Sequence, residues 1–462
     1  MRTEPFSSSA REVYVGRLDS EHYFAFNFGA PRGVAVLSKR AVARLGEWKH
    51  GTAEPTSIES AKLDADLAKR GLIPTLPVQF QSPPKPEGDR RFTVWLHVTN
   101  ACNFGCHYCY IPHLNRTINP ESIARLSIPK SSISPLLAKL VTFCERNGLE
   151  KLQLKFAGGE PTLNLPLIEA LCSEATTYDS SVKISFSMLS NGSFDTQTVG
   201  PILKKFNIAL SISADGIAES HDRIRRSIDK SAPFSSWDKI ETVTRELLNL
   251  GIHPYFLYTV TSGNLDQVSA FSDWCHSKKL GFRLSLVRNK IPPTRALQER
   301  AANMLTQFYA RLGHTLPVDL RLERHARFSE WNLSKIKHSA CATCRNYVAV
   351  AQNGDVSSCQ MTMNTPHGNI LLEPMENILS KFKSDPNLQT LANPDRKSGA
   401  CLRCQFFHVC SGGCPQHTSH TFGNPDGPSP WCEVYGAVAP VYIEAVARHL
   451  LRRAVAAQIA GN

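Results

Sequence analysis

The sequence reads His97-Val-Thr-Asn-Ala-Cys102-Asn-Phe-Gly-Cys106-His-Tyr-Cys109-Tyr110 directly after an apolar, β-branched run at residues 93–98. Its cysteines have the spacing C-x3-C-x2-C. Three thiolates in one loop can ligate three irons of a [4Fe–4S] cube, whereas full ligation takes four cysteines. One iron then stays open to a small molecule. Structural zinc sites prefer four closed ligands, usually from C-x2-C pairs, so this spacing fits zinc poorly.

Around this loop, apolar runs alternate with amphipathic stretches along the chain. The alternation predicts an α/β fold with a parallel sheet, whose strands are covered on both faces and therefore read as apolar runs. The expected strands are residues 93–98, 152–156, 182–188, 208–213, 255–260 and 282–287. The expected helices are residues 134–145, 166–178, 196–206, 237–250 and 265–278.

Short polar motifs follow three of these strands: Gly158-Gly159-Glu160-Pro161, Ser190-Asn191-Gly192 and Ser213-Ala-Asp215-Gly216. Each alone is typical of a turn. Their order at the carboxyl ends of successive strands is where α/β folds place their sites. With the cysteine loop, residues 93–290 resemble the radical S-adenosylmethionine (SAM) superfamily. The resemblance implies a partial (β/α)6 TIM-like barrel, with Cys102, Cys106 and Cys109 holding the cluster that binds SAM.

The same resemblance implies contacts to SAM from residues of this chain. The Gly158–Glu160 motif is expected to hold the amino group, and the next two motifs are expected to contact the ribose and carboxylate. Arg225 or Arg226 could pair with the SAM carboxylate, because guanidinium groups suit carboxylates, although both also fit a plain surface role. The expected SAM-binding set is Tyr108, Gly158, Gly159, Glu160, Ser190, Asn191, Ser213, Asp215 and Arg225.

A second set of eight cysteines lies between residues 341 and 432. Eight thiolates suit two fully ligated [4Fe–4S] clusters, and equally two zinc sites. The run C-x2-C-x5-C-x3-C from Cys401 to Cys414, with Gly354 before Cys359, resembles the SPASM domain of peptide-modifying radical SAM enzymes. The resemblance assigns auxiliary cluster I to Cys341, Cys344, Cys359 and Cys414. It assigns auxiliary cluster II to Cys401, Cys404, Cys410 and Cys432. The short gap between Cys341 and Cys344 departs from the pattern and leaves open whether cluster I is fully ligated.

The rest of the chain divides by composition. Residues 1–80 predict a winged-helix-like unit with a hairpin around residues 13–28, helices at residues 39–48 and 57–69, and a closing strand at residues 72–78. A linker rich in proline and charge spans residues 81–91. The radical SAM core is expected at residues 92–300, a helical connector at 301–338, the SPASM domain at 339–437 and a final helix at 438–462.

These features predict a radical SAM oxidoreductase that matures a ribosomally made precursor peptide. It would cleave SAM to a 5′-deoxyadenosyl radical, abstract hydrogen from the peptide and leave a cross-linked or oxidised residue. The N-terminal unit resembles elements that bind a leader peptide as an added strand. The net charge of +12 would suit an acidic leader, while no aromatic-interleaved basic patch favours nucleic acid. An electron donor such as flavodoxin or ferredoxin is the other expected partner.

Three alternatives stay open from the sequence. Sulfatase maturases carry an aspartate base directly after the third auxiliary cysteine, where this chain has Gln360. Glutamine cannot accept a proton at neutral pH, so that activity is disfavoured. Oxidation of a small molecule is the second alternative and a zinc-ribbon binding module the third. The absence of a signal-like start and of a membrane-length apolar segment predicts a cytoplasmic location without a membrane partner.

Overall fold

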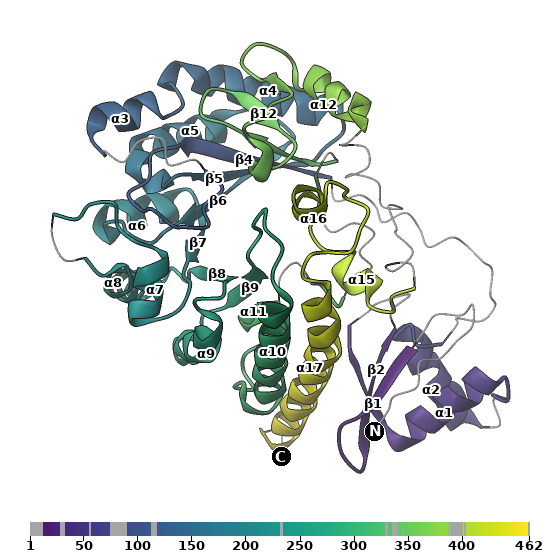
Figure 1. The fold of residues 1–462 in the computed structure, drawn as a ribbon. Helices are drawn as coiled ribbons and strands as arrows, with labels where there is room; N and C mark the ends of the chain where they lie inside the picture. The colour runs from purple at the N-terminus through teal and green to yellow at the C-terminus, as the bar shows by residue number, and fades with distance from the viewer. Residues whose placement is uncertain are drawn as a thin grey trace. The chain divides into compact units, whose positions relative to one another are not determined.

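The structure is a computed structural model of the chain. It describes residues 13–27, 33–54, 57–73, 90–111, 118–231, 234–328, 331–334, 341–343, 345–386, 388, 401 and 403–460. The chain forms two compact units. Unit 1 comprises residues 1–84, 290–340 and 397–462, and unit 2 comprises residues 85–289 and 341–396. Figure 1 shows the helices and strands of both units.

The N-terminal part of unit 1 is an antiparallel sheet with two helices. The strands follow the order β1-β2-β3, and a small apolar core beneath them includes Ala25, Leu37 and Leu67. Ser38 and Ser57 cap the two helices with their side chains, as N-cap serines commonly do. The elements are β1 (Val13–Arg17), β2 (His22–Asn27), β3 (Ala35–Ser38), α1 (Lys39–His50) and α2 (Ile58–Lys69).

This part contains one strand that the sequence did not predict. The hairpin and both helices lie at the predicted positions, but residues 35–38 form a further strand, β3, that continues into α1 with no intervening turn. The predicted closing strand at residues 72–78 lies outside the described residues from Pro74 onward, as does the predicted linker up to Asp89. Arg91, assigned to that linker, is the first residue of β4 (Arg91–Thr99).

Two long helices dominate the remainder of unit 1. α10 (Arg295–Thr315) packs against α17 (Cys432–Ala460) so closely that a Cβ on Gly313 would lie 2.9 Å from Ala445 Cα. Helix α17 also reaches the N-terminal sheet, where Arg448 Nη1 donates to Leu18 O at 3.0 Å. Shorter elements complete the unit: α11 (Leu322–His325), β10 (Arg327–Phe328), α15 (Phe407–Cys410) and α16 (Pro415–Phe422).

The expected helical connector is helical only as far as Thr315. Pro317 follows, and the residue before a proline disfavours the helical conformation. The chain beyond it holds only the short elements α11 and β10 before residue 329.

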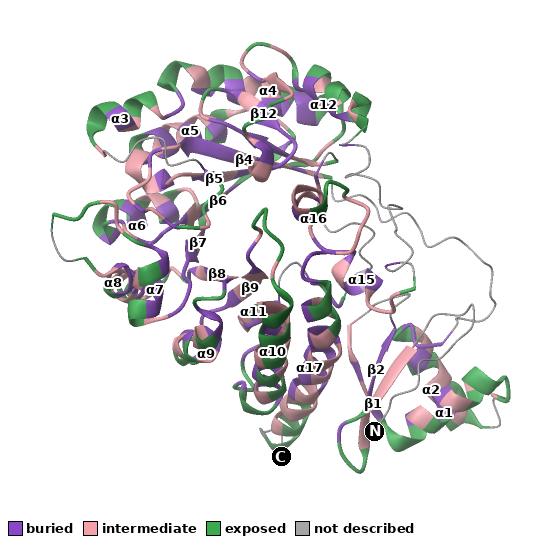
Figure 2. Ribbon diagram, viewed as in Figure 1, coloured by how far each residue is buried: buried purple, intermediate pink, exposed green. Residues whose placement is uncertain are grey.

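Unit 2 is built on the parallel sheet that the sequence predicts. Its strands lie in the order β9-β8-β7-β6-β5-β4-β11-β12-β13, and strands β4 to β9 pair in parallel with their neighbours. Figure 2 shows the buried strands beneath more exposed helices, and the α/β class is confirmed. The strands are β4, β5 (Lys151–Gly158), β6 (Lys183–Ser190), β7 (Ala209–Ser213), β8 (Tyr255–Val260) and β9 (Phe282–Leu286), and the helices are α3 (Pro120–Arg125), α4 (Ile133–Arg146), α5 (Leu165–Thr177), α6 (Thr196–Lys205), α7 (Ala218–Ile224), α8 (Ser236–Asn249) and α9 (Val268–Ser277).

The sheet continues into the cysteine-rich segment. β11 (Tyr347–Val350) pairs in parallel with β4, with Tyr347 opposite Thr93 and Val350 opposite Leu96. β12 (Asp355–Ser357) and β13 (Gly368–Asn369) extend it in antiparallel fashion, and α12 (Met375–Ser384) follows. The sheet is therefore mixed, and residues 341–396 belong to the same compact unit as the core.

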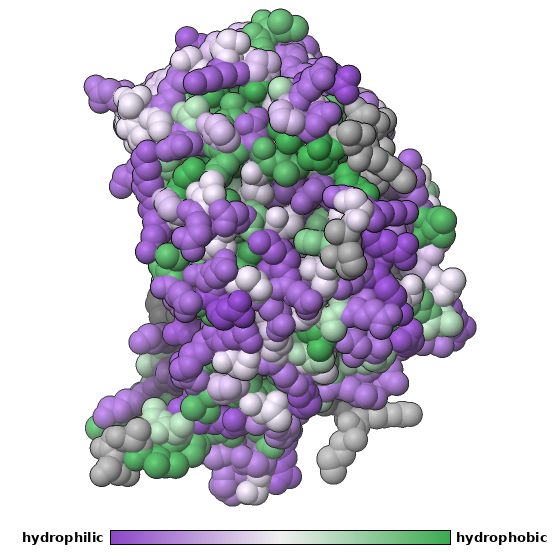
Figure 3. Space-filling model, turned by 90° about the vertical axis from the view of Figure 1, so that its left-hand side faces the viewer, coloured by the Kyte–Doolittle hydropathy of each residue, from purple (hydrophilic) through white to green (hydrophobic). Residues whose placement is uncertain are grey.

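The surface is largely polar. Figure 3 shows hydrophilic residues spread over most of one face, with apolar residues gathered in its upper part. Among the described residues, no helix combines the length and the apolar character needed to cross a bilayer.

Candidate active site

The three cysteines of the C-x3-C-x2-C loop lie close together immediately after β4. Burial raises the pKa of Cys102, and the negative charges of Glu160, Cys106 and Cys109 raise it further. Burial likewise raises the pKa of Cys106 to about 11, although the Arg225 guanidinium opposes the shift. Thiolates gathered in one place repel each other, and a metal centre that binds them removes this penalty. The donor set therefore fits an iron–sulfur cluster with three protein ligands.

The glycine pair at the end of β5 is packed against the start of this loop. A Cβ on Gly158 would lie 1.9 Å from Thr99 O, and one on Gly159 would lie 2.1 Å from Ala101 O. Gly159 N donates to Thr99 O at 2.9 Å and Glu160 N donates to Ala101 O at 2.8 Å. Gly158 also has a φ of +127°, which L side chains rarely adopt. Both glycines are thus required for β5 to hold the cysteine loop.

Glu160 uses its carboxylate to join the first and second motifs. It is buried, and its Oε1 accepts from Ser190 Oγ at 2.8 Å and Thr162 Oγ1 at 2.6 Å, while Oε2 accepts from Asn191 N at 2.7 Å. Burial raises the pKa of this carboxyl, and the hydrogen bonds from Thr162, Asn191 and Ser190 partly offset the rise. A carboxylate with three or more donors is held in one orientation.

Tyr108, Asp215 and Arg225 form a hydrogen-bonded group beside Cys106. Arg225 Nε donates to Asp215 Oδ2 at 2.6 Å, and the Tyr108 hydroxyl bonds both Asp215 and Arg225. Arg225 Nη1 also lies 3.7 Å from Cys106 Sγ. Burial alone would lower the pKa of Arg225, but the charges of Asp215, Tyr108 and Cys106 outweigh it and the pKa rises. The group places one fixed positive charge next to a cluster ligand.

The structure distinguishes between the two candidate arginines. Arg225 is buried, whereas Arg226 is exposed and its Nε donates to Arg223 O at 2.9 Å. Ser213 is buried at the end of β7. The predicted residues on β5, β6 and β7 therefore all lie at the same carboxyl-terminal edge of the sheet as the cysteine loop.

Four residues that sequence reasoning missed support this edge. Asn103 Oδ1 accepts from Asn191 Nδ2 at 2.8 Å, which ties the cysteine loop to the second motif. Thr259 N donates to Asp215 Oδ1 at 2.7 Å, Asn264 Nδ2 donates to Asp215 O at 3.1 Å, and Asp215 N donates to His221 Nδ1 at 3.1 Å. Only Asn264 could have been recognised from the sequence, because it ends a turn-like Ser-Gly-Asn after β8.

A family model described as the radical SAM superfamily matches residues 96–274. The matched range contains the three cysteines and all three strand-end motifs described above. The chain contains a radical SAM domain. Enzymes of this superfamily use SAM with a [4Fe–4S] cluster, and a loop that supplies three cysteines would hold such a cluster while leaving one iron for SAM.

Relatives of the radical SAM domain extend the likeness beyond it. The chain is 21% identical over 353 residues to the radical SAM cyclopropyl synthase TigE of Paramaledivibacter caminithermalis, which covers 73% of this chain and 70% of TigE. It is 25% identical over 358 residues to the mycofactocin maturase MftC of Mycolicibacterium smegmatis, which covers 74% of this chain and 83% of MftC. Native anSMEcpe with bound AdoMet and Cp18Cys peptide shares the fold, with a TM-score of 0.63 at 17% identity over 79% of this chain and 99% of that chain. The protein is thus a radical SAM enzyme related to maturases.

Two cysteines of the second set lie in unit 2 beside the radical SAM loop. Burial raises the pKa of Tyr347 well above its usual value, and the charges of Cys359, Tyr110 and Cys341 raise it further. Tyr347 OH donates to Gln360 Oε1 at 2.5 Å. These residues share one neighbourhood at β11 and β12. Cys344 lies outside the described residues, and Cys414 belongs to unit 1.

Four other cysteines of the second set lie together in unit 1. Burial raises the pKa of Cys410 to about 12, and the charges of Cys404, Cys432 and Cys401 raise it further. Cys432 is the first residue of α17 and Cys410 the last of α15. The charges of these thiols therefore act on one another. By contrast, Cys144, Cys172 and Cys275 are fully buried within α4, α5 and α9, where they pack as small apolar side chains.

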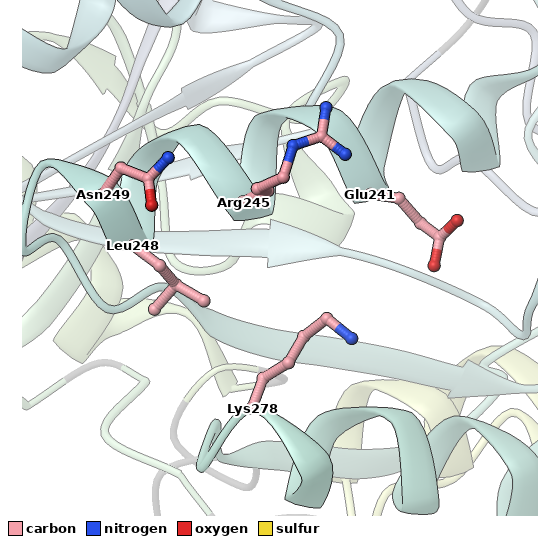
Figure 4. A pocket seen from close by; sticks show the side chains of 5 residues that line it. All are labelled: Glu241, Arg245, Leu248, Asn249 and Lys278. Atoms are coloured by element: carbon pink, nitrogen blue, oxygen red, sulfur yellow. The ribbon is translucent and has the colours of Figure 1, made fainter.

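A surface hollow between α8 and the end of α9 is separate from this site. Figure 4 shows the side chains that line it: Glu241, Arg245, Leu248, Asn249 and Lys278. Lys278 Nζ lies 4.7 Å from the Trp274 ring centroid, and Trp274 Nε1 donates to Glu241 at 2.9 Å. The carboxyl end of α8 precedes β8, so this hollow lies at the opposite edge of the sheet from the cysteine loop.

Proposed function

We propose that this protein is a radical SAM peptide maturase. The observation that supports it most directly is the cysteine loop with three gathered thiols and one open coordination position, held by motifs from three further strand ends. When bound there, SAM supplies a 5′-deoxyadenosyl radical that abstracts hydrogen from the substrate. The proposed SAM contacts are Tyr108, Gly158, Gly159, Glu160, Ser190, Asn191, Ser213, Asp215 and Arg225.

We assign distinct roles to these residues. Arg225 already bonds Asp215, so the pair positions Tyr108 and supplies a positive charge near Cys106. Glu160 fixes Ser190 and Asn191. Its own carboxylate is occupied by donors, which favours backbone atoms of the glycine pair as the partners of the SAM amino group. The side chains thus build the shape of the SAM site before SAM arrives.

Three [4Fe–4S] clusters are part of the proposal. Cys102, Cys106 and Cys109 hold the radical SAM cluster. Auxiliary cluster II takes Cys401, Cys404, Cys410 and Cys432, a set supported by the mutual charge effects of these four thiols. Auxiliary cluster I takes Cys341, Cys344, Cys359 and Cys414, a set supported by the proximity of Cys341 and Cys359 to Tyr347. Such clusters accept the electron left after hydrogen abstraction or bind the substrate.

The N-terminal unit is proposed to receive a leader peptide. β2 is the central strand of its sheet, so β1 and β3 are edge strands, the kind of element to which a peptide adds as a further strand. The helices beside the sheet are fixed to each other, because Arg44 Nη2 bonds Asp64 Oδ2 at 2.6 Å and Trp48 Nε1 bonds Asp64 Oδ1 at 2.8 Å. A rigid unit loses little entropy when it binds an extended peptide.

A sulfatase-maturase-like activity is the second candidate function, and Gln360 separates it from the first. The Gln360 side-chain oxygen accepts the Tyr347 hydroxyl at 2.5 Å. An amide in this position orients a neighbour and cannot take a proton from a cysteine or serine substrate. The geometry therefore disfavours a reaction that needs a carboxylate base at this position.

The test is anaerobic incubation of the reconstituted enzyme with SAM, a reductant and a precursor peptide encoded beside its gene. We expect 5′-deoxyadenosine together with a peptide that has lost two hydrogens, measured by mass spectrometry. A leaderless core peptide is the control and should show a raised KM. Deoxyadenosine without a change in the precursor would contradict the proposed substrate class. Iron and sulfide analysis gives about twelve irons per chain for three clusters, and far fewer for a zinc-ribbon module.

A further inference from the structure

A chain of hydrogen bonds runs from the β11–β12 turn to the cysteine loop through side chains that the proposed chemistry does not use. Asn100 Nδ2 donates to Gln352 Oε1 at 2.7 Å. Asn100 Oδ1 lies 2.9 Å from His97 Nδ1, and His97 Nε2 lies 3.2 Å from the Tyr110 hydroxyl. All four residues belong to unit 2.

The direction of each bond in this chain follows from the orientation of the Asn100 and Gln352 amides. The Asn100 amide nitrogen donates to Gln352, so the Asn100 amide oxygen faces His97. An amide oxygen can only accept a hydrogen bond, so His97 Nδ1 carries a proton. His97 is 1% exposed, and burial lowers its pKa to about 4 against the raising effect of Asn100, so the imidazole is neutral. A neutral imidazole protonated at Nδ1 accepts at Nε2. The Tyr110 hydroxyl is therefore the donor, and its hydrogen points at His97.

The position of Tyr110 makes the direction of that hydrogen important. Tyr110 follows the cluster ligand Cys109 directly in the sequence. Tyr110 is 41% exposed, while its hydroxyl is bonded to the buried His97. A phenolic O–H bond is weaker than the C–H bonds of an aliphatic substrate. An accessible phenol next to the radical-generating cluster would thus be a competing hydrogen donor.

We propose that the Gln352–Asn100–His97 chain withholds the Tyr110 hydroxyl hydrogen from the radical, so that the ring lines the substrate space without quenching the reaction. Tyr110 is then a positioning residue, and His97 acts through it. The reaction that the chain suppresses is a transfer of one hydrogen atom. In it the O–H bond of Tyr110 breaks, a C–H bond forms at the 5′ carbon, and a tyrosyl radical remains. This inference rests on the radical chemistry of the proposed function.

Isotope labelling tests the inference. In deuterated water the tyrosine hydroxyl carries deuterium, whereas the carbon-bound hydrogen of a substrate does not exchange. Under single-turnover conditions we expect His97→Leu to raise the deuterium content of 5′-deoxyadenosine about tenfold over wild type, the change expected when one restraining hydrogen bond is lost. A tyrosyl radical signal should accompany it. The double variant His97→Leu with Tyr110→Phe should return to the wild-type isotope content.

Two outcomes would overturn the inference: an unchanged deuterium content in His97→Leu, or an elevated content that persists in the double variant. A second measurement requires neither a bound cluster nor a variant that folds correctly. The 15N chemical shifts of His97 in metal-free wild-type protein should show a protonated Nδ1 and an unprotonated Nε2, and the opposite tautomer contradicts the chain. A wild-type enzyme that released no 5′-deoxyadenosine would instead contradict the proposed function and leave the tautomer measurement as the deciding result.

Discussion

The radical SAM loop and the second cysteine set represent two ways of gathering thiols. The first set spans residues 102–109 on one loop after one strand, and motifs from β5 and β6 hold that loop through backbone and side-chain bonds. The second set spans residues 341–432 and contributes cysteines to both compact units. A local site is specified by spacing alone, whereas a dispersed site also depends on which strands pair and which helices pack.

Cys102→Ala should have the largest effect, because a local set has no substitute for a missing ligand. We expect loss of reductive SAM cleavage and a fall from about twelve to about eight irons per chain. Release of 5′-deoxyadenosine and iron content measure the two effects. SAM cleavage at the wild-type rate in this variant would remove the basis of the proposed function.

Cys410→Ala tests the dispersed set. We expect loss of about four irons and of modified peptide, while substrate-free SAM cleavage continues, because the cysteine loop does not depend on this cluster. Cys275→Ala is the matched control, since Cys275 is a fully buried helical cysteine outside any proposed ligand set. Loss of SAM cleavage in Cys410→Ala would show that the two sets do not form independently.

Arg225→Leu tests what holds the local site apart from its cysteines. Removing one partner of a buried ion pair leaves Asp215 without its guanidinium, which should lower the free energy of unfolding by about 3–5 kcal/mol. Arg226→Leu, at the exposed neighbouring position, should change it by less than about 0.5 kcal/mol. Urea denaturation of the metal-free proteins compares the two. Equal effects would show that the group around Asp215 is not a stabilising element.

The smallest effect is a pH dependence from His221. Burial lowers the pKa of His221 to about 4 in the folded protein, compared with about 6.5 when unfolded. Below pH 6.5 the unfolded chain takes up a proton that the folded protein does not, so stability falls with pH, by about 3 kcal/mol in total at pH 4. In His221→Gln, denaturation curves recorded between pH 7 and pH 4 should show a correspondingly shallower fall. A slope identical to wild type would assign the pH dependence to other groups.

The sequence predicted the parallel strands of the core because their apolar runs are long and separated by regular helices. It also predicted which residues gather at the edge that carries the cysteine loop, since Gly158, Asn191 and Asp215 lie at the carboxyl ends of successive strands in order. It did not reveal Asn103 or Thr259, because each bonds a partner far along the chain, nor His221, which stands in no recognisable motif. The parallel pairing of β11 with β4 joins residues about 250 positions apart, and local patterns carry no information on such a pair.

Local sequence patterns also predicted only part of the N-terminal unit. Its hairpin and helices follow from alternation and capping, but β3 has four residues and continues directly into α1. Arg44 and Asp64 form a nearly buried ion pair between the two helices, which the helical pattern alone does not indicate. Whether the unit is a winged helix, and whether a leader binds it, stay predictions.

The β4–β11 ladder has a practical consequence for protein engineering. Tyr347 to Val350 align residue by residue with Thr93 to Leu96, and a one-residue slip in a strand turns every side chain to the opposite face. A chimera that exchanges the C-terminal cysteine segment at residue 340 would cut this sheet and replace one of its inner strands. Exchange partners should instead retain residues 341–396 with their own core and be joined beyond that point.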